Sequence, residues 1–447
     1  MTQAYKYLHF IKNSIFFLWD PKRLSLSALK YRYNTIPLKD VLSVPKMEWI
    51  DIEDDKDYPI LGVHAQGEGV YINRIAKGKE LTMKQYQRSK PMHLFYCKVR
   101  TVNGQWGIVY PEFSNSYGSS NMQYLSISQE KLNPSFLELL LRVKSITQEW
   151  DKNAVGADGR HFPLKTLLNL QIPLPSLEEQ NKIVAAYNAT IVQADILSAQ
   201  AQNIDGQIQN YIQKELGIES KKEEKNNQPK GFLHIFNFHQ LWDRWDMLNT
   251  SSVIFDKLSI SKYQIVTLGS TFKCVMRSWK KEGTTFNYIE MGCVNPSDGI
   301  IESQTIETKK APSRATQIVH AGDLIIGTTR PYLKRFAIVT EQYHNNVCSS
   351  AFQVIAPNIT YNLHFLHEFL LTSFAVEQFE HYMTGALYPA ITNKDLKKIQ
   401  IPLPPLAIQN EIVNHITALR AEQKNLQQQA SDLRLQAQQQ FEQTIFN

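Results

Sequence analysis

One stretch of the sequence occurs twice, and this repeat constrains the fold more than any other feature. Residues 171–184 and 400–413 share the pattern Ile-Pro-Leu-Pro-x-Leu-x-x-Gln-x-x-Ile-Val and lie 229 positions apart. The correspondence runs without a gap from Phe136 and Phe365 to the ends of two long polar segments. Such a repeat predicts that the chain folds as two copies of one structural unit.

Each copy opens a segment whose apolar residues recur at alternating spacings of four and three, the heptad period of paired helices. The other faces are rich in Gln, Asn, Lys and Glu. A helix this polar, roughly 58 Å long at 1.5 Å per residue, is not stable alone. We predict that the two stripes pack on each other; the alternative is two separate helices, each lying on its own globular domain. The stripes are Ile183, Tyr187, Thr190, Ala194, Leu197, Ala201, Ile204, Ile208 and Tyr211, and Ile412, Ile416, Leu419, Gln423, Leu426, Ala430, Leu433, Ala437 and Gln440.

The prolines before each helix restrict the preceding residues to extended conformations, so these segments are predicted to be stiff, non-helical straps. Ser176 and Glu179 have the spacing of a capping box. Pro405 and Ile408 replace them in the second copy, so that helix must be capped by the Pro-Pro geometry or by a partner. Gly206, inside the first helix, marks a bend, a close crossing or a tolerated flaw that costs about 1 kcal/mol relative to Ala.

Composition sets broad limits on the class of protein. The chain has 447 residues, enough for two or three domains, and a formal net charge of +6, which permits a polyanionic partner without demanding one. Its four cysteines are scattered, which argues against a zinc site or a disulfide framework and fits a reducing cytoplasm. The apolar run at 15–19 is too short for a membrane span.

The region before each strap is predicted to be an α+β globule. Short β segments between residues 50 and 130 include a hairpin at Asn103-Gly104, and Asn133-Pro134 starts a helix that continues to Val143. Residues 260–357 are similar, and one helix from Phe365 to Phe379 matches the first. A charged Asn- and Pro-containing segment at 219–231 is typical of a solvated linker. The predicted organisation is two domains, two strap-helix segments and a linker, at 1–171, 172–217, 218–231, 232–400 and 401–447.

Catalytic signatures are absent from the sequence. It contains no phosphate-binding loop, no dinucleotide fingerprint, no Gly-x-Ser-x-Gly elbow and no His/Cys set with metal spacing. Asn133-Pro134-Ser135-Phe136 is faintly similar to the Asn-Pro-Pro-aromatic motif of amino-methyltransferases, but a helix start explains it better. The acidic run 51–57 is interpreted as an exposed loop rather than a metal site. We expect no metal and no cofactor.

Basic residues gather with polar and aromatic residues in both halves. Lys and Arg neutralise phosphates, and Arg, Gln and Asn read base edges in the major groove. Taken singly, each such residue is more often a solvated surface residue; as matched clusters in duplicated globules they favour binding of a polyanion. The candidate DNA-binding residues are Lys77, Lys79, Lys84, Gln85, Tyr86, Arg88, Lys90, Arg277, Ser278, Trp279, Lys280, Lys281, Lys309, Lys310, Arg314, Thr329, Arg330 and Tyr332.

With these motifs, the whole chain resembles the specificity subunits of Type I restriction-modification enzymes. The resemblance rests on the twin Ile-Pro-Leu-Pro segments, on Gly156 and Gly385 before them, and on 321–325 with 329–331; the first half lacks a counterpart of Gly322-Asp323-Leu324-Ile325. It implies two target-recognition domains that each read half of a bipartite site on duplex DNA. It also implies two long helices packed antiparallel as a spacer with pseudo-two-fold symmetry.

The same resemblance implies a non-catalytic subunit without cofactors, located in the cytoplasm and not in a membrane. Its expected partners are double-stranded DNA, two adenine methyltransferase subunits and restriction-translocase subunits. Three alternatives stay open at this point: a methyltransferase or nuclease with degenerate motifs, a scaffold that does not touch DNA, and the recognition subunit of a Type IIB-like or other phage-defence system.

Overall fold

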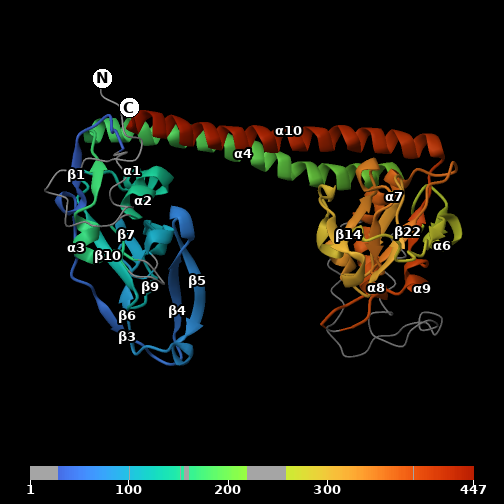
Figure 1. Ribbon diagram of the computed structural model, residues 1–447, viewed down its shortest axis with the longest axis horizontal. Helices are drawn as coiled ribbons and strands as arrows, with labels where there is room; N and C mark the ends of the chain where they lie inside the picture. Colours follow the sequence, from blue (N-terminus) through green and yellow to red (C-terminus); the bar gives the residue numbers. More distant parts are fainter. Residues whose placement is uncertain (1–28, 100, 152, 156–160, 219–257, 386) are drawn as a thin grey trace, which may run out of the picture. The chain divides into compact units, whose positions relative to one another are not determined.

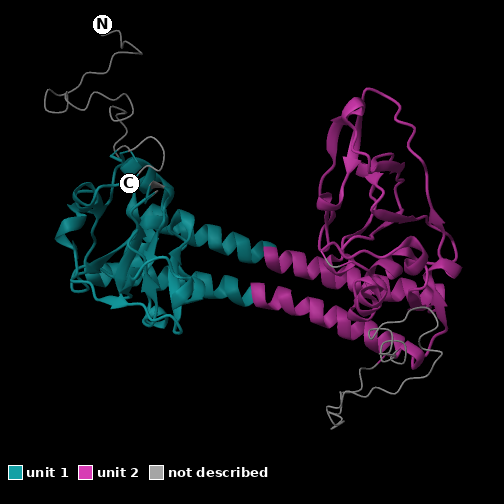
Figure 2. Cartoon of the chain, turned by 90° about the horizontal axis from the view of Figure 1, so that it is seen from below, with its two compact units in different colours: residues 1–197, 428–447 teal, residues 198–427 magenta. Residues whose placement is uncertain are grey.

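The computed structural model describes residues 29–447 except 100, 152, 156–160, 219–257 and 386. The apolar run at 15–19 and the proposed linker at 219–231 therefore lie outside the described residues. The described chain forms two compact units, residues 1–197 with 428–447 and residues 198–427 (Figure 2). Each unit combines β-sheets, short helices and parts of both long helices, α4 (Leu177–Leu216) and α10 (Leu406–Ile445) (Figure 1).

The first unit contains two main sheets. A four-stranded sheet has the order β2-β10-β7-β8, and a five-stranded sheet has the order β3-β6-β9-β4-β5. The strands are β2 (Leu42–Ser43), β3 (Trp49–Asp51), β4 (Asp57–Val63), β5 (Val70–Lys77), β6 (Gln85–Arg88), β7 (His93–Cys97), β8 (Trp106–Ile108), β9 (Tyr117–Gly118) and β10 (Met122–Ile127). The helices are α1 (Pro134–Arg142), α2 (Lys144–Asp151) and α3 (Leu164–Leu168). The predicted hairpin is confirmed, since β7 pairs antiparallel with β8 across Gly104, which has φ of 72°.

The second unit repeats this plan. Its sheets have the orders β13-β22-β19-β20 and β17-β14-β21-β18, and β15 and β16 form a separate pair. The strands are β13 (Cys274–Val275), β14 (Thr285–Ile289), β15 (Val294–Asn295), β16 (Gly299–Ile300), β17 (Gln304–Glu307), β18 (Ala315–Ile318), β19 (Leu324–Gly327), β20 (Phe336–Ile338), β21 (Val347–Ser349) and β22 (Phe352–Ile355). The short helices are α6 (Leu268–Thr271), α7 (Leu363–Leu370), α8 (Ser373–Tyr382) and α9 (Asn393–Leu396).

The single helix expected from Phe365 to Phe379 is a wrong prediction, because the structure has two helices there. α7 ends at Leu370 and α8 begins at Ser373. Thr372 is fully buried and causes the break: its Oγ1 donates to the carbonyl of Phe369 at 2.6 Å and accepts from the amide of Ala375 at 3.4 Å. In the first unit α1 similarly ends at Arg142, one residue before the predicted Val143, and α2 follows.

Both straps are extended, as the prolines predict. β11 (Gln171–Pro173) pairs antiparallel with β1 (Thr35–Pro37), and β23 (Gln400–Pro402) pairs antiparallel with β12 (Ile265–Thr267). Each of the two strand pairs is three residues long, and the paired residues are at equivalent positions in the two copies. Each strap is thus tied to the start of its own globule before the long helix begins.

The two long helices pack antiparallel along their predicted stripes. In the first unit, Tyr187 and Phe441 lie with ring centroids 6.4 Å apart. In the second, Gln423 Nε2 donates to the carbonyl of Ala201 at 3.0 Å, and the Tyr211 ring lies tilted against the His415 ring with centroids 4.1 Å apart. Residue numbers rise along α4 as they fall along α10. The stripe alanines Ala194, Ala201, Ala430 and Ala437 are buried at these contacts. The alternative of two separate helices is therefore wrong.

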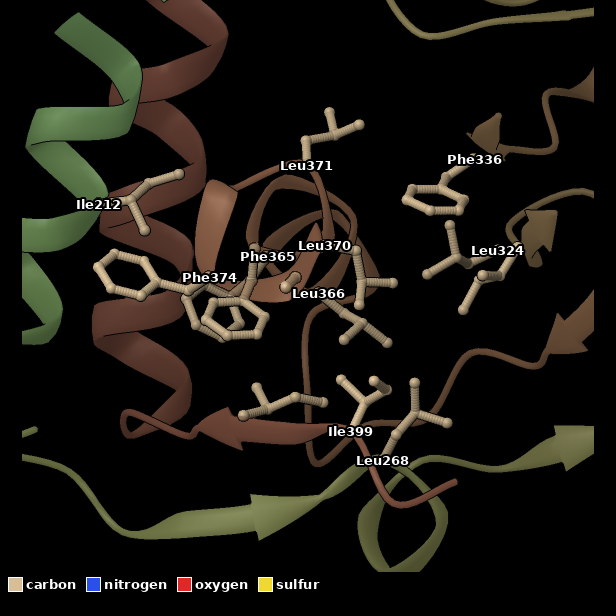
Figure 3. Packing of buried hydrophobic residues seen from close by; sticks show 14 of the residues in the cluster. Ile212, Leu268, Leu324, Phe336, Phe365, Leu366, Leu370, Leu371, Phe374 and Ile399 are labelled. Carbon is tan, nitrogen blue, oxygen red and sulfur yellow. The ribbon is translucent and has the colours of Figure 1, made fainter. Parts of the chain in front are cut away.

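Each long helix ends in the hydrophobic core of a unit. Phe441 and Ile445, at the end of α10, are buried with the core of the first unit. Ile212 and Leu216, at the end of α4, are buried with the core of the second. Figure 3 shows Ile212 facing the aromatic side chains of α7 and α8 in this second core.

Gly206 lies on the open side of its helix. A Cβ atom built there would meet only Asn203 Oδ1, at 3.9 Å, among the described residues. The close-crossing interpretation of this glycine is therefore wrong.

Candidate nucleic-acid interface

A buried glutamine fixes each globule to its long helix in the same way. In the first copy, Gln180 Oε1 accepts from the amide of Asn133 at 2.8 Å, and its Nε2 donates to the carbonyls of Lys131 and Pro175 at 2.9 and 3.0 Å. Asn133 caps α1 and also donates through Nδ2 to Asn181 Oδ1 at 2.7 Å. These side chains bind the first turn of α4 to the start of α1.

The second copy repeats the arrangement with residues 229 positions later. Gln409 Oε1 accepts from the amide of Asn362 at 2.8 Å, and its Nε2 donates to the carbonyl of Pro404 at 2.8 Å. Asn362 caps α7 and donates to Asn410 Oδ1 at 2.8 Å. Gln180 is 0% exposed and Gln409 is 1% exposed, so both carry out this role away from water. The second helix, which lacks the Ser-x-x-Glu box, is held at its start by this side chain.

The four-stranded sheet β2-β10-β7-β8 of the first copy matches β13-β22-β19-β20 of the second at an offset of 230. The pairs Leu94↔Ile108 and Leu324↔Ile338 occupy the same register, as do Met122↔Cys97 and Gly327↔Phe352. The first copy also has a counterpart of Gly322, which the sequence motif did not reveal. Met92 has φ of 56° where Gly322 has φ of 84°, and both amides bond to equivalent carbonyls, of Val109 and Val339.

This correspondence places predicted basic residues at equivalent positions. Lys79 and Lys309 lie in matching short 3-10 helices, Gly78–Glu80 and Thr308–Lys310. Lys84 directly precedes β6, and Arg314 directly precedes the equivalent strand β18. All four side chains are exposed, and none forms an ion pair with another described residue. The two copies thus present cations from the same two points of one scaffold.

In the second copy the predicted residues gather around an aromatic cluster. Trp279 lies against Phe286, with ring centroids 4.1 Å apart, and both belong to a small apolar cluster that includes residues of β14, β18 and β21. Ala311, from the loop that carries Lys309, Lys310 and Arg314, packs on the same cluster. Lys280 and Lys281 are exposed beside Trp279, and Lys310 pairs with Glu307 at 3.1 Å.

In the first copy the predicted residues are closer to acidic groups. The amides of Gly78 and Lys79 donate to carbonyls in the loop 54–56, so the acidic run lies beside Lys77 and Lys79. Its carboxylates are exposed, as predicted. Gln85 Nε2 donates to Asp51 Oδ1 at 2.7 Å, which lowers the capacity of this side chain for other partners.

Other residues predicted in the first copy have local partners. Arg88 lies 3.7 Å from Glu48, and Lys90 Nζ donates to the carbonyl of Lys46 at 2.5 Å. The Tyr86 side chain is 3% exposed in a small core with Tyr58, and is therefore covered by protein.

Arg277 has a structural partner. Its guanidinium forms two hydrogen bonds with Asp323, at 2.6 and 3.1 Å, and this carboxylate is fully buried. Asp323 also accepts from the amide of His320 at 2.8 Å. The neighbouring Ser278 is exposed and bridges to Gln317, whose equivalent in the first copy is Gln87. Both glutamines are buried and donate to equivalent carbonyls of Phe352 and Met122.

Thr329, Arg330 and Tyr332 lie at the same end of the second copy as Arg314. The amide of Ser350 donates to the carbonyl of Arg314 at 2.7 Å, and the amide of Thr328 donates to the carbonyl of the next residue, Ala351, at 2.8 Å. The structure therefore brings the two basic segments to one turn between β21 and β22. Sequence reasoning missed Leu387 and Tyr388, which lie on a loop beside Arg330, because no periodic pattern marks them.

Metal-ligating side chains do not gather in the part of the chain that the structure describes. It contains no cluster of three or more His, Cys, Asp or Glu side chains suited to a metal ion. Burial raises the pKa of the Cys348 thiol to about 12, so this group is not a nucleophile at neutral pH. Among the described helices, none combines the length and apolarity required to cross a membrane.

The fold and this surface define a class: a duplicated α+β protein whose two globules share a helix pair and carry exposed cations at equivalent positions. Comparisons with known proteins agree. The family model of the Type I restriction modification DNA specificity domain matches residues 32–205 and again 260–432. The chain therefore belongs to the Type I restriction-modification DNA specificity family.

Individual proteins show the same likeness. The chain is 24% identical over 344 residues to the Type I restriction enzyme EcoDI specificity subunit of Escherichia coli, covering 74% of this chain and 72% of that protein. A solved structure concerned with complex assembly and conformational transition of the type I R-M system has a chain with a TM-score of 0.55 at 16% identity. The match covers 93% of this chain and 98% of that one, and it supports the fold.

Proposed function

We propose that this protein is the DNA sequence-recognition subunit of a Type I restriction-modification complex. Two target-recognition domains, residues 1–171 and 232–400, each read one half of a bipartite site. The strap-helix segments 172–217 and 401–447 set the spacing between the half-sites, and residues 218–231 join the copies. The subunit itself is non-catalytic and needs no cofactor.

The observation that carries the proposal is the duplication of exposed cations on one scaffold. Lys79 with Lys84, and Lys309 with Arg314, project from equivalent points of the two copies. Two half-sites on duplex DNA offer the same phosphate backbone twice, so two equivalent sets of cations suit them. A scaffold protein that does not bind DNA would not require exposed cations at equivalent positions of its two copies.

Within the second copy, the cluster around Trp279 supplies both kinds of contact that DNA recognition requires. Lys280, Lys281 and Lys309 neutralise phosphates and position the duplex, while Arg314 is suited to base edges. In the first copy Lys77, Lys79 and Lys84 take the phosphate role. Tyr86 and Arg277, which are engaged inside the protein, support the neighbouring strands instead.

In this proposal, other subunits of the complex carry out the catalysis. Two adenine methyltransferase subunits and the restriction-translocase subunits dock on the chain in the cytoplasm, where the complex meets DNA. Long polar helix faces outside the apolar stripe offer these subunits a surface that is available in both copies.

Mapping of methylated adenines tests the function directly. Cells that express this chain with its neighbouring methyltransferase should methylate one bipartite sequence, and cells that express the methyltransferase alone should not. Binding of the complex to DNA should weaken steeply with salt, because each phosphate contact releases counterions. Methylation that is independent of this chain, or binding to DNA that ignores salt, would contradict the proposal.

A further inference from the structure

Arg330 is held in an uncommon backbone conformation by a neighbouring loop. Its φ is 49°, in the left-handed region. Its amide donates to the carbonyl of Pro389 at 2.7 Å, and Nη2 donates to the carbonyl of Leu387 at 3.1 Å. The guanidinium carbon lies 4.8 Å from the centre of the Tyr388 ring. Such backbone strain persists where the surroundings determine it, and it concentrates at functional sites.

The loop that holds Arg330 exposes its largest side chains. Thr384 and Ala390 exchange two backbone hydrogen bonds of 2.9 Å, which close the loop at its base. Between them Leu387 is 82% exposed and Tyr388 is 73% exposed. Arg330 Nε is buried without a hydrogen-bond partner among the described residues. A loop that is closed at its base and presents exposed apolar and aromatic groups beside a guanidinium indicates a contact with another molecule.

The first copy has the same loop base and a different tip. Val155 and His161, the equivalents of Thr384 and Ala390, exchange the same two hydrogen bonds, at 2.9 and 3.0 Å. In the sequence, Arg100 stands where Arg330 stands, and the tips are Asp-Gly-Arg at 158–160 and Leu-Tyr-Pro at 387–389. Arg100 and the first tip lie outside the described residues, so only their sequence is compared. The copies share the arginine and differ in the side chains of the tip.

Building on the function proposed above, we infer that Arg330 binds a phosphate of the DNA backbone and that Leu387 and Tyr388 contact base edges of the second half-site. The backbone is common to both half-sites, which accounts for an arginine at both positions. The bases differ between half-sites, which accounts for different tips. Two identical methyltransferase subunits would instead meet the same tip in both copies, so the sequence difference favours DNA over a protein partner.

The position of this loop supports the same partner. Thr329, next to Arg330, bridges to Ala390 in the loop, and Thr328 is bonded to the turn that also holds Arg314. The loop therefore continues the basic surface of the second copy. Tyrosine and arginine together provide stacking, phosphate binding and hydrogen bonding at one place.

The test uses the full chain in complex with its methyltransferase subunits. Three variants are compared: Arg330→Gln, Tyr388→Ala, and a tip exchange that places Asp, Gly and Arg at 387, 388 and 389. Ile359→Ala is the matched control, because Ile359 is 90% exposed in the same unit and outside this surface. Unchanged circular dichroism and Tm show that a variant is folded. If Arg330→Gln does not fold, Tyr388→Ala still tests the inference, because it changes an exposed side chain.

We expect Arg330→Gln to weaken binding to specific and non-specific DNA by a similar factor, about tenfold, and to reduce the slope of log K against log salt by about 0.9. Tyr388→Ala should lower specific binding with little change in non-specific binding. The tip exchange should alter the second half-site in the methylome and leave the first unchanged. Ile359→Ala should match the wild type.

Three results would overturn the inference. In the first, the tip exchange leaves the methylated sequence unchanged and Arg330→Gln also leaves the salt slope of DNA binding unchanged. Another is loss of methyltransferase binding in these variants while the remaining complex binds DNA normally, which would assign the loop to a protein partner. The third is a wild-type complex that methylates no bipartite sequence, which would also reject the function itself; the first two leave that function intact.

Discussion

Replacing Gln409 with Leu tests the connection between the second globule and its long helix. The side chain is 1% exposed and bonds two backbone groups, the amide of Asn362 and the carbonyl of Pro404, both at 2.8 Å. Leucine has a similar volume and bonds neither group. A buried polar group left unpaired costs about 1–3 kcal/mol.

The two unpaired groups, offset by the added apolar burial, should lower the free energy of unfolding by about 2–4 kcal/mol. Calorimetry of the full chain should show a fall in Tm of roughly 2–4 °C for each kcal/mol in a unit of this size. Gln427→Leu is the matched control, since Gln427 is an exposed glutamine on the same helix. Gln180→Leu should cost at least as much, because Gln180 makes three such bonds.

Hydrogen exchange separates this local effect from a general loss of stability. Amides in the first turns of α10 and at the start of α7 should exchange faster in Gln409→Leu than in the control. If Gln409→Leu and Gln427→Leu differ by less than about 0.5 kcal/mol, the buried glutamine does not fix the helix, and the reasoning from unpaired groups fails.

Three further changes test other parts of the account. Gly206→Ala should stabilise the chain by about 1 kcal/mol in urea unfolding, because the new methyl group enters open space; destabilisation would show a contact there. Asp323→Ala should destabilise the second unit by about 3–5 kcal/mol in the same assay, because it leaves its arginine partner without a counterion; a cost below about 1 kcal/mol would contradict this role. Burial raises the pKa of Glu368, but His367 and Arg420 outweigh it and hold this pKa below its usual value. The stabilisation is therefore present above the unfolded pKa of about 4.3 and is lost as pH falls through the lower folded value, and Glu368→Gln should flatten this part of the profile of Tm against pH.

The repeat and the helices were predictable because their signals are periodic. The heptad stripe holds apolar residues at fixed spacings, and the structure buries its alanines. Proline restricts its neighbours through local sterics alone, so the extended straps followed from the sequence. The helix pairing thus depends on a partner with the same pattern, and the straps depend on local geometry.

The surface was harder to predict because its residues depend on distant partners. Nothing local distinguishes Tyr86, which is buried, from the exposed Lys84 and Arg88 beside it. Arg277 is occupied by Asp323, 46 positions away, and only the fold brings them together. Met92 takes the left-handed conformation that glycine usually marks, so its equivalence to Gly322 is absent from the sequence pattern. The exposed loop at Tyr388 follows no period at all.

Removing one heptad from both long helices tests the central claim most directly. Residues 195–201 and 424–430 are equivalent stretches, 229 positions apart, and they face each other where the helices pair, so their removal keeps the antiparallel pairing in phase. Seven residues correspond to about 10.5 Å of helix, or about three base pairs at 3.4 Å each. Methylome sequencing of cells that express this variant with the methyltransferase should show both original half-sites separated by a spacer about three base pairs shorter. An unchanged spacer, or altered half-sites at the original spacing, would contradict the account.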